Sequence, residues 1–121
     1  HVMHAEWASL SQQTIDAIHS AQENNGRIIA VGTTSARVLE GVFAQHGKLV
    51  PFDDDLNLFV RPGFSFRVVD ALITNFHLPK TTLLALVAAF LGSRDRLFDC
   101  YTHALSHDYR FASFGDAMLI I

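Results

Sequence analysis

The feature that most constrains the fold is an apolar run over residues 83–91, LLALVAAFL, which has almost no polar position. A helix that is hydrophobic on every side needs protein around it, or a membrane. The run is too short to cross a bilayer, which takes about 20 residues. We therefore expect a buried helix, with Pro79 near its first position and Gly92 just past its end.

Strand-like and helix-like segments alternate along the rest of the chain. The expected order is a helix over 11–24, a strand over 27–32, a helix from Thr33 to Gly47, an acidic loop at 51–55, a strand over 64–76, the buried helix, a helix after Ser93, and two short strands within 109–121. This alternation predicts an α/β fold in which helices flank a mixed sheet. The length of 121 residues suits a single segment with one core.

Local signals predict where the outer helices begin and which side chains they bury. Ser9 and Gln12 have the spacing of a capping box, and Gly26 suits the end of the first helix. Ile15 and Ile18 should point inward from that helix. The helix after Ser93 should bury one stripe of apolar and aromatic side chains, namely Leu97, Phe98, Tyr101 and Leu105.

The composition indicates a segment of a larger protein rather than a free-standing domain. Half of the residues are apolar and only 17% are charged, so some apolar surface should meet another segment. The chain starts at His1 and stops within AMLII, and we expect it to be the C-terminal third of a longer enzyme. The net charge of −3 gives no general attraction to nucleic acid. One cysteine, Cys100, excludes an internal disulfide and suits the reducing cytoplasm.

The first stretch that could form part of a binding or catalytic site is GTTSAR, directly after an apolar strand. Gly32 allows a tight turn, and the N–H groups that open the next helix favour an anion. Thr33, Thr34 and Ser35 add hydroxyl groups, and Arg37 adds a cation. The simpler interpretation is a helix cap in which the threonine hydroxyls serve only the backbone.

The second stretch is HVMHAEW, which contains His1, His4 and Glu6. These groups could act as acids and bases or bind a metal, yet the spacing matches no established zinc pattern. We predict no metal site. Histidines that hydrogen-bond to a neighbouring segment are the simpler interpretation.

The third stretch, NFHLPKTT, leads from a predicted buried strand into the apolar helix. Ligands of α/β sheets bind where strands end. Asn75 offers a donor and an acceptor, His77 can move a proton near neutral pH, and Thr82 adds a hydroxyl group. Alternatively, Asn75 satisfies the turn backbone and His77 is a half-buried cap.

The fourth stretch, YRFASFGDA, places Arg110 between aromatic residues, with Asp116 following a glycine. A cation among aromatic rings suits phosphate contact and base stacking. Alternating aromatic residues are also typical of one face of a strand, and Asp116 of a turn.

Four stretches together resemble one family over essentially the whole chain. HVMHAE, RIIAVGTTSARVLE, PGFSFRVVDALITNFHLPKTTLLALVAAFLG and YRFASFGDAMLI resemble, in this order, the C-terminal part of the S-adenosylmethionine:tRNA ribosyltransferase-isomerases of queuosine biosynthesis. The resemblance implies an α/β domain that carries an inserted β-barrel domain, which this chain lacks. It also implies a cytoplasmic enzyme, active as a monomer, whose partners are S-adenosylmethionine and the tRNA anticodon stem-loop.

The implied reaction moves the ribosyl unit of S-adenosylmethionine onto 7-aminomethyl-7-deazaguanine at the tRNA wobble position. Epoxyqueuosine forms, and adenine and methionine leave. S-adenosylmethionine is consumed, so no cofactor is implied. The sulfonium acidifies the adjacent ribose carbon, which makes a general base useful. The candidates for proton transfer are His77 and His4, assisted by Glu6 or Asp116.

The resemblance also suggests binding roles. The Gly32–Ser35 turn and Arg37 would hold the methionine carboxylate, Asn75 and Thr82 would contact substrate, and Phe76 would face the sulfonium. Four cations are candidates for tRNA phosphates, namely Arg61, Arg67, Lys80 and Arg110. The alternatives are a catalytically incomplete fragment, a general nucleotide-binding α/β module with GTTSAR as its phosphate site, or a purely structural domain.

Overall fold

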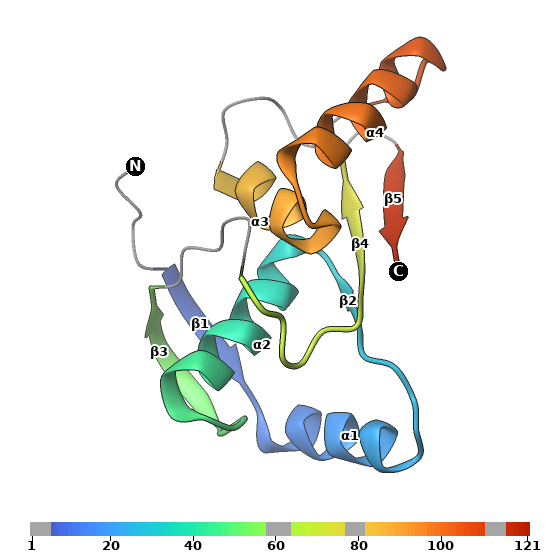
Figure 1. Cartoon of the computed structure of the whole chain (residues 1–121). Helices are drawn as coiled ribbons and strands as arrows, with labels where there is room; N and C mark the ends of the chain where they lie inside the picture. The colour runs from blue at the N-terminus through green and yellow to red at the C-terminus, as the bar shows by residue number, and fades with distance from the viewer. Residues whose placement is uncertain (1–5, 58–63, 77–81, 111–115) are drawn as a thin grey trace.

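A computed structural model describes residues 6–57, 64–76, 82–110 and 116–121; within α3 it describes side chains from residue 85 onward. The elements in chain order are β1 (Glu6–Leu10), α1 (Gln12–Glu23), β2 (Ile29–Val31), α2 (Thr33–His46), β3 (Phe52–Leu56), β4 (Ala71–Asn75), α3 (Thr82–Leu91), α4 (Arg94–Ser106) and β5 (Ala117–Ile120) (Figure 1). The α/β fold class is confirmed.

The strands form two sheets. β1 and β3 make an antiparallel ribbon, in which Glu6 lies opposite Leu56. The other sheet has the order β2-β4-β5 and is mixed, because β2 runs parallel to β4 while β5 runs antiparallel to it. The parallel pair requires a crossover, which α2 and β3 supply along the chain.

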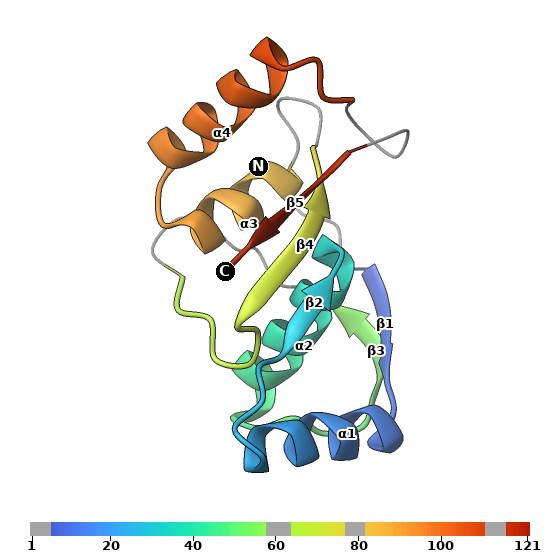
Figure 2. The same ribbon diagram turned by 90° about the vertical axis from the view of Figure 1, so that its right-hand side faces the viewer.

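The core lies between α2, α3 and one face of the mixed sheet. α2 and α3 lie on the same side of β2, β4 and β5, and Figure 2 views the sheet from the other side. Leu72 of β4, Val42 of α2 and Leu86 of α3 are all buried in one cluster. The apolar run is therefore a buried helix, as its sequence predicts, and Gly92 follows it with a φ of 98°.

α1 confirms the predicted helix but begins and ends differently. Ser11, not Ser9, is the N-cap, and its hydroxyl accepts a hydrogen bond from the Thr14 N–H at 3.2 Å. Ser9 lies in β1, whose pairing with β3 fixes its backbone. At the other end Asn25, with a φ of 60°, takes the left-handed position expected for Gly26. The Gly26 N–H still donates to the Ala21 carbonyl at 2.7 Å, which completes the cap.

The expected acidic loop at 51–55 is wrong, because Phe52–Leu56 is strand β3. Its three aspartates are exposed, so their carboxylates stay in water while the backbone pairs with β1. Local composition predicted a loop, since aspartate is depleted in strands. A long-range partner strand reversed that preference.

The expected strand over 64–76 forms only at 71–75. Directly before it, the carboxylate of Glu40 in α2 accepts three backbone N–H groups, from Arg67 at 2.7 Å, Val68 at 2.9 Å and Val69 at 2.8 Å. These N–H groups are bonded to a side chain and not to a neighbouring strand. The pattern of hydrophobic residues could not show that the Glu40 carboxylate takes the place of a neighbouring strand.

Two further features differ from what the local sequence suggests. The apolar strand β2 exposes Ile29 and Val31 within the described part of the chain. In α4, Leu97 and Ala104 are buried, while Phe98 and Leu105 face solvent. Of the two predicted C-terminal strands, only β5 forms among the described residues. Residues 109–110 are not in a strand, and residues 111–115 lie outside the described chain, so the first of these two strands stays a prediction.

Candidate active site at one edge of the mixed sheet

Three of the stretches singled out from sequence end at the same edge of the mixed sheet. β2 and β4 are parallel with Val31 opposite Ile73, so the turn after β2 and the end of β4 lie at one edge. β5 is antiparallel to β4, and Ala117 lies opposite Asn75. Asp116, one residue earlier, therefore comes to that edge as well. The edge is formed by the carboxyl ends of parallel strands, where α/β proteins bind ligands.

The turn between β2 and α2 depends on Gly32. Its φ of 96° and ψ of 147° lie in a region that only glycine adopts easily. Its N–H donates to the Ile73 carbonyl at 2.7 Å and so continues the ladder between β2 and β4. The α2 helix thus starts directly at the sheet edge.

The expected threonine cap of α2 is wrong. Gly32 occupies the N-cap position, and no side chain there caps the helix. Thr33 is buried, whereas Thr34 and Ser35 are exposed. The first N–H groups of a helix have no partner within the helix. This geometry leaves them suited to a bound anion, which the helix dipole also favours.

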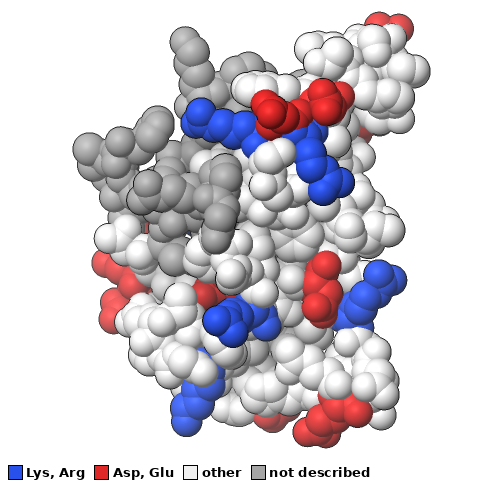
Figure 3. Space-filling view, viewed as in Figure 1, with Lys and Arg blue, Asp and Glu red and all other residues white. Residues whose placement is uncertain are grey.

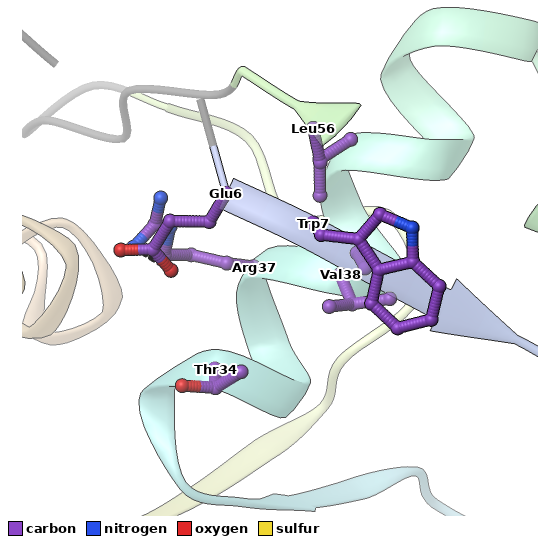
Figure 4. A pocket seen from close by; sticks show the side chains of 7 residues that line it. Glu6, Trp7, Thr34, Arg37, Val38 and Leu56 are labelled. Carbon is purple, nitrogen blue, oxygen red and sulfur yellow. Dashed lines mark ion pairs between the residues drawn. The ribbon is translucent and has the colours of Figure 1, made fainter. Parts of the chain in front are cut away.

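Arg37 lies one turn further along α2 and pairs with Glu6 at the start of β1. The guanidinium and carboxylate are 3.7 Å apart, and the Arg37 side chain is only 12% exposed. Figure 4 shows the two charged groups side by side at the rim of a hollow that Thr34 also lines. The hollow itself, about 20 Å³, has room for about one water molecule and cannot hold a nucleoside.

A larger groove lies beside this hollow, between β1, the start of α1 and the start of α2. Its volume is about 480 Å³, within the range of small-molecule sites. Thr34 and Ser35 line it, together with Trp7 of β1. The Trp7 side chain is 65% exposed, which is unusual for the largest apolar residue. Trp7 ends the stretch HVMHAEW, and no sequence pattern predicted a role for it.

At the β4–β5 side of the edge, Asp116 and Phe76 both have internal partners. The Asp116 carboxylate accepts the Arg110 backbone N–H at 2.7 Å, and the Asp116 N–H donates to the Arg110 carbonyl at 3.2 Å. Phe76 is buried, and its ring packs edge-on against Tyr101 and Tyr109. The role of Phe76 beside a sulfonium stays a prediction, and Trp7 is the more accessible ring.

The remaining predicted residues are scattered or lie outside the described chain. His4, Arg61, His77 and Lys80 lie outside it. Thr82 is the first residue of α3. Arg67 and Arg110 are both exposed, but they lie near opposite ends of β4. Arg67 precedes the first residue of β4, whereas the Arg110 N–H is hydrogen-bonded to Asp116 near the last residue of β4. On the face shown in Figure 3, basic and acidic side chains are interspersed.

Glu40 is the residue that sequence reasoning missed most clearly. Its side chain is 1% exposed, yet it carries a carboxylate. A signal was present, because Glu40 directly follows Leu39 and lies two residues before Val42, two apolar residues that α2 also buries. A charged residue among buried apolar residues indicates a buried partner.

Comparison with known proteins places this arrangement in a family. The model of the family described as "Queuosine biosynthesis protein" matches residues 1–120. The chain belongs to this family. The resemblance found in the four sequence motifs is therefore confirmed.

Two relatives in the queuosine biosynthesis family illustrate how much of a protein the chain represents. The S-adenosylmethionine:tRNA ribosyltransferase-isomerase of Acaryochloris marina is 54% identical over 121 residues, which is 100% of this chain and 32% of the relative. The protein of the same name from Rhodopseudomonas palustris is 52% identical, covering 99% of this chain and 33% of the relative. The chain thus spans about a third of the length of the curated relatives it matches.

A crystal structure of S-adenosylmethionine tRNA ribosyltransferase from Thermotoga maritima has the same fold. It superposes with a TM-score of 0.87 at 43% sequence identity, over 95% of this chain and 40% of that one. Among the described residues, no helix is long and apolar enough to span a membrane. Within the same ranges, no three potential metal-ligating side chains come together.

Proposed function

We propose that the chain is part of a tRNA-modifying transferase-isomerase. The full-length enzyme would move the ribosyl unit of S-adenosylmethionine onto 7-aminomethyl-7-deazaguanine at the tRNA wobble position and yield epoxyqueuosine. The observation that carries this proposal is the meeting of the Gly32–Ser35 turn, Asn75 and Asp116 at one sheet edge. Relatives that are about half identical carry the name of that activity.

The start of α2 is suited to the carboxylate of the methionine moiety. The outward N–H groups of α2 and the hydroxyl groups of Thr34 and Ser35 supply donors. Arg37 adds a cation. Among the described residues its guanidinium pairs with Glu6 alone, and a guanidinium has five N–H donors, so we propose that others of them meet the ligand. The Trp7 ring, in the same groove, offers a face to the sulfonium.

The acid–base steps belong at the other side of the edge. Abstraction of the proton beside the sulfonium needs a base, and departing adenine needs a proton or a hydrogen-bond donor. Asp116 has a half-buried carboxylate there, and the half-buried Asn75 lies at the end of β4. His77 follows two residues after Asn75 in sequence, and His4 two residues before Glu6. We propose His77 as the general base, with His4 and Glu6 as the alternative pair.

The tRNA would bind as its anticodon stem-loop, through contacts with phosphates. Arg110 is exposed next to the edge and can meet the loop that carries the modified base. Arg67 lies at the opposite end of β4 and would contact the stem, with Arg61 and Lys80 as further candidates. We propose a cytoplasmic enzyme that is active as a monomer and needs no metal or resident cofactor.

Adenine release tests this proposal directly. The full-length protein is mixed with S-adenosylmethionine and an anticodon stem-loop bearing 7-aminomethyl-7-deazaguanine, and adenine is quantified by chromatography. We expect release that depends on the modified base and falls at least about 100-fold in His77→Ala. Release at the parental rate in His77→Ala would exclude His77 as the base. Thermal protection by ATP or NAD that exceeds protection by S-adenosylmethionine would favour a general nucleotide-binding module instead.

A further inference from the structure

The mixed sheet has one face that no described element covers. Side chains alternate along a strand, so paired residues on neighbouring strands share a face. The register places Val31, Ile73 and Leu119 in one row across all three strands. Ile29 and Ile121 lie on the same face by the same alternation. Ala71, between Ile29 and Ile121 on the same face, is small and fully buried. The five larger apolar residues define what we call the open face of the sheet.

The open face is apolar and accessible. Exposed fractions are 47% for Ile29, 68% for Val31, 58% for Leu119 and 80% for Ile121, while Ile73 is half-buried between them. The opposite face, represented by Ala30, Leu72 and Ile120, is buried against the helices. In Figure 2, which looks onto the open face, no helix is drawn in front of the strands. A run of large apolar side chains in the centre of a sheet marks a surface that is normally covered.

The sheet type indicates what kind of layer is missing. A sheet that contains a parallel pair is typically covered on both faces, and in α/β folds the cover is helical. α2 and α3 supply one layer only. The family relatives are about three times as long as this chain, so two thirds of their polypeptide lies outside these residues.

We propose that the open face is an internal docking surface for the remainder of the full-length polypeptide, which places a helical layer on Val31, Ile73 and Leu119. The occupant is a segment of the same molecule and not a second copy. The inference is independent of the reaction proposed above, since it rests on the register and exposure of the sheet.

Two leucines provide a matched test. Leu119 on the open face and Leu105 on α4 are 58% and 67% exposed in this chain. The unmodified full-length protein is treated with a photoactivated carbene reagent, and peptide mass spectrometry quantifies modification at each leucine. We expect Leu119 to be modified at least about fivefold less than Leu105, because a covered apolar layer excludes solvent and reagent. Equal modification of the two leucines would overturn the proposal.

Cysteine variants distinguish the occupant. Val31→Cys and Leu105→Cys are introduced separately into the full-length protein, and maleimide labelling rates are compared across a wide range of protein concentrations. We expect slow labelling at position 31 and fast labelling at position 105, at every concentration. Protection of position 31 that disappears on dilution would assign the face to a second copy and contradict the proposal. Thermal unfolding checks that each variant is folded.

Discussion

The carboxylate of Glu40 accepts the backbone N–H of Val69 at 2.8 Å, although the two residues are 29 positions apart in the chain. Two further N–H groups, from Arg67 and Val68, reach the same carboxylate. One buried side chain in α2 thereby fixes the segment that leads into β4, whose end carries Asn75. Asp70 adds a second tie, since its carboxylate accepts the Ile28 N–H at 2.7 Å.

The first prediction concerns Glu40→Gln. The amide keeps one oxygen acceptor but turns an NH₂ group toward backbone donors, so at least one N–H loses its partner in a buried place. We expect the free energy of unfolding to fall by about 2–4 kcal/mol. Urea denaturation of the full-length protein measures this change. Glu23→Gln, at the exposed end of α1, is the control and should change it by less than about 0.5 kcal/mol.

The second prediction concerns the contact of α2 with β3. A Cβ atom on Gly41 would lie 2.8 Å from one terminal methyl of Leu56 and 3.1 Å from its Cγ. Leu56 is buried, so we expect Gly41→Ala to cost about 1–3 kcal/mol despite the better helix propensity of alanine. In the double variant with Leu56→Ala the clash is removed. Its cost should be smaller than the sum of the two single variants, and strict additivity would refute the clash.

The third prediction separates strain from ligand binding at Gly32. Apart from the chain neighbours of Gly32, no atom of the described residues lies within 4 Å of a Cβ placed there, so we attribute the cost of Gly32→Ala to the positive φ. We expect a loss of about 1–3 kcal/mol in stability. Gly47→Ala is the control, because Gly47 also has a positive φ and an open surrounding at the far end of α2. Calorimetric titration should show weaker S-adenosylmethionine binding for Gly32→Ala but not for Gly47→Ala. If the two variants bind S-adenosylmethionine with equal affinity, the turn at Gly32 does not take part in binding.

The fourth prediction tests Arg37 as a ligand-binding cation. We expect Arg37→Met to weaken S-adenosylmethionine binding by about 10–100-fold, through loss of a charge-assisted hydrogen bond. Glu6→Gln removes the partner of the ion pair and leaves the cation, so affinity should be kept or increased. The ion pair joins an exposed Glu6 to a largely buried Arg37 at a long distance of 3.7 Å. It should contribute about 0–1 kcal/mol, and both variants should stay folded. Parental affinity in Arg37→Met would leave Arg37 with a structural role only.

The fifth prediction concerns Asp116. Asp116→Asn retains an oxygen that can accept the Arg110 N–H, so the melting temperature should change little. If the carboxylate takes part in proton transfer, adenine release should fall by about 100-fold or more. Rate measurements on this variant and on Asp116→Ala are compared. If only Asp116→Ala loses most of the rate, and its melting temperature also falls, then the role of Asp116 is only to hold the Arg110 backbone through its hydrogen bond.

The helices were predictable because their signals are local. Ile15 and Ile18 repeat at helical spacing and are buried, Ser93 caps α4 with its hydroxyl group, and Gly47 ends α2 in the left-handed conformation. The strands were less predictable. Asp53–Asp55 contradicts strand propensity, and only the partner β1 makes that segment a strand. For 67–69, the carboxylate of Glu40 replaces the strand partner that periodicity suggested.

The sequence alone determined the helices, the buried apolar run and the family, because each depends on residues that are close together in the chain or match a motif directly. Only the tertiary structure decided which of the candidate site residues meet. The parallel pairing of β2 with β4 and the antiparallel pairing of β5 bring Gly32, Asn75 and Asp116 to one edge and leave Arg67 at the other. Strand order and direction are set by long-range backbone pairing, and no local pattern of side chains encodes them.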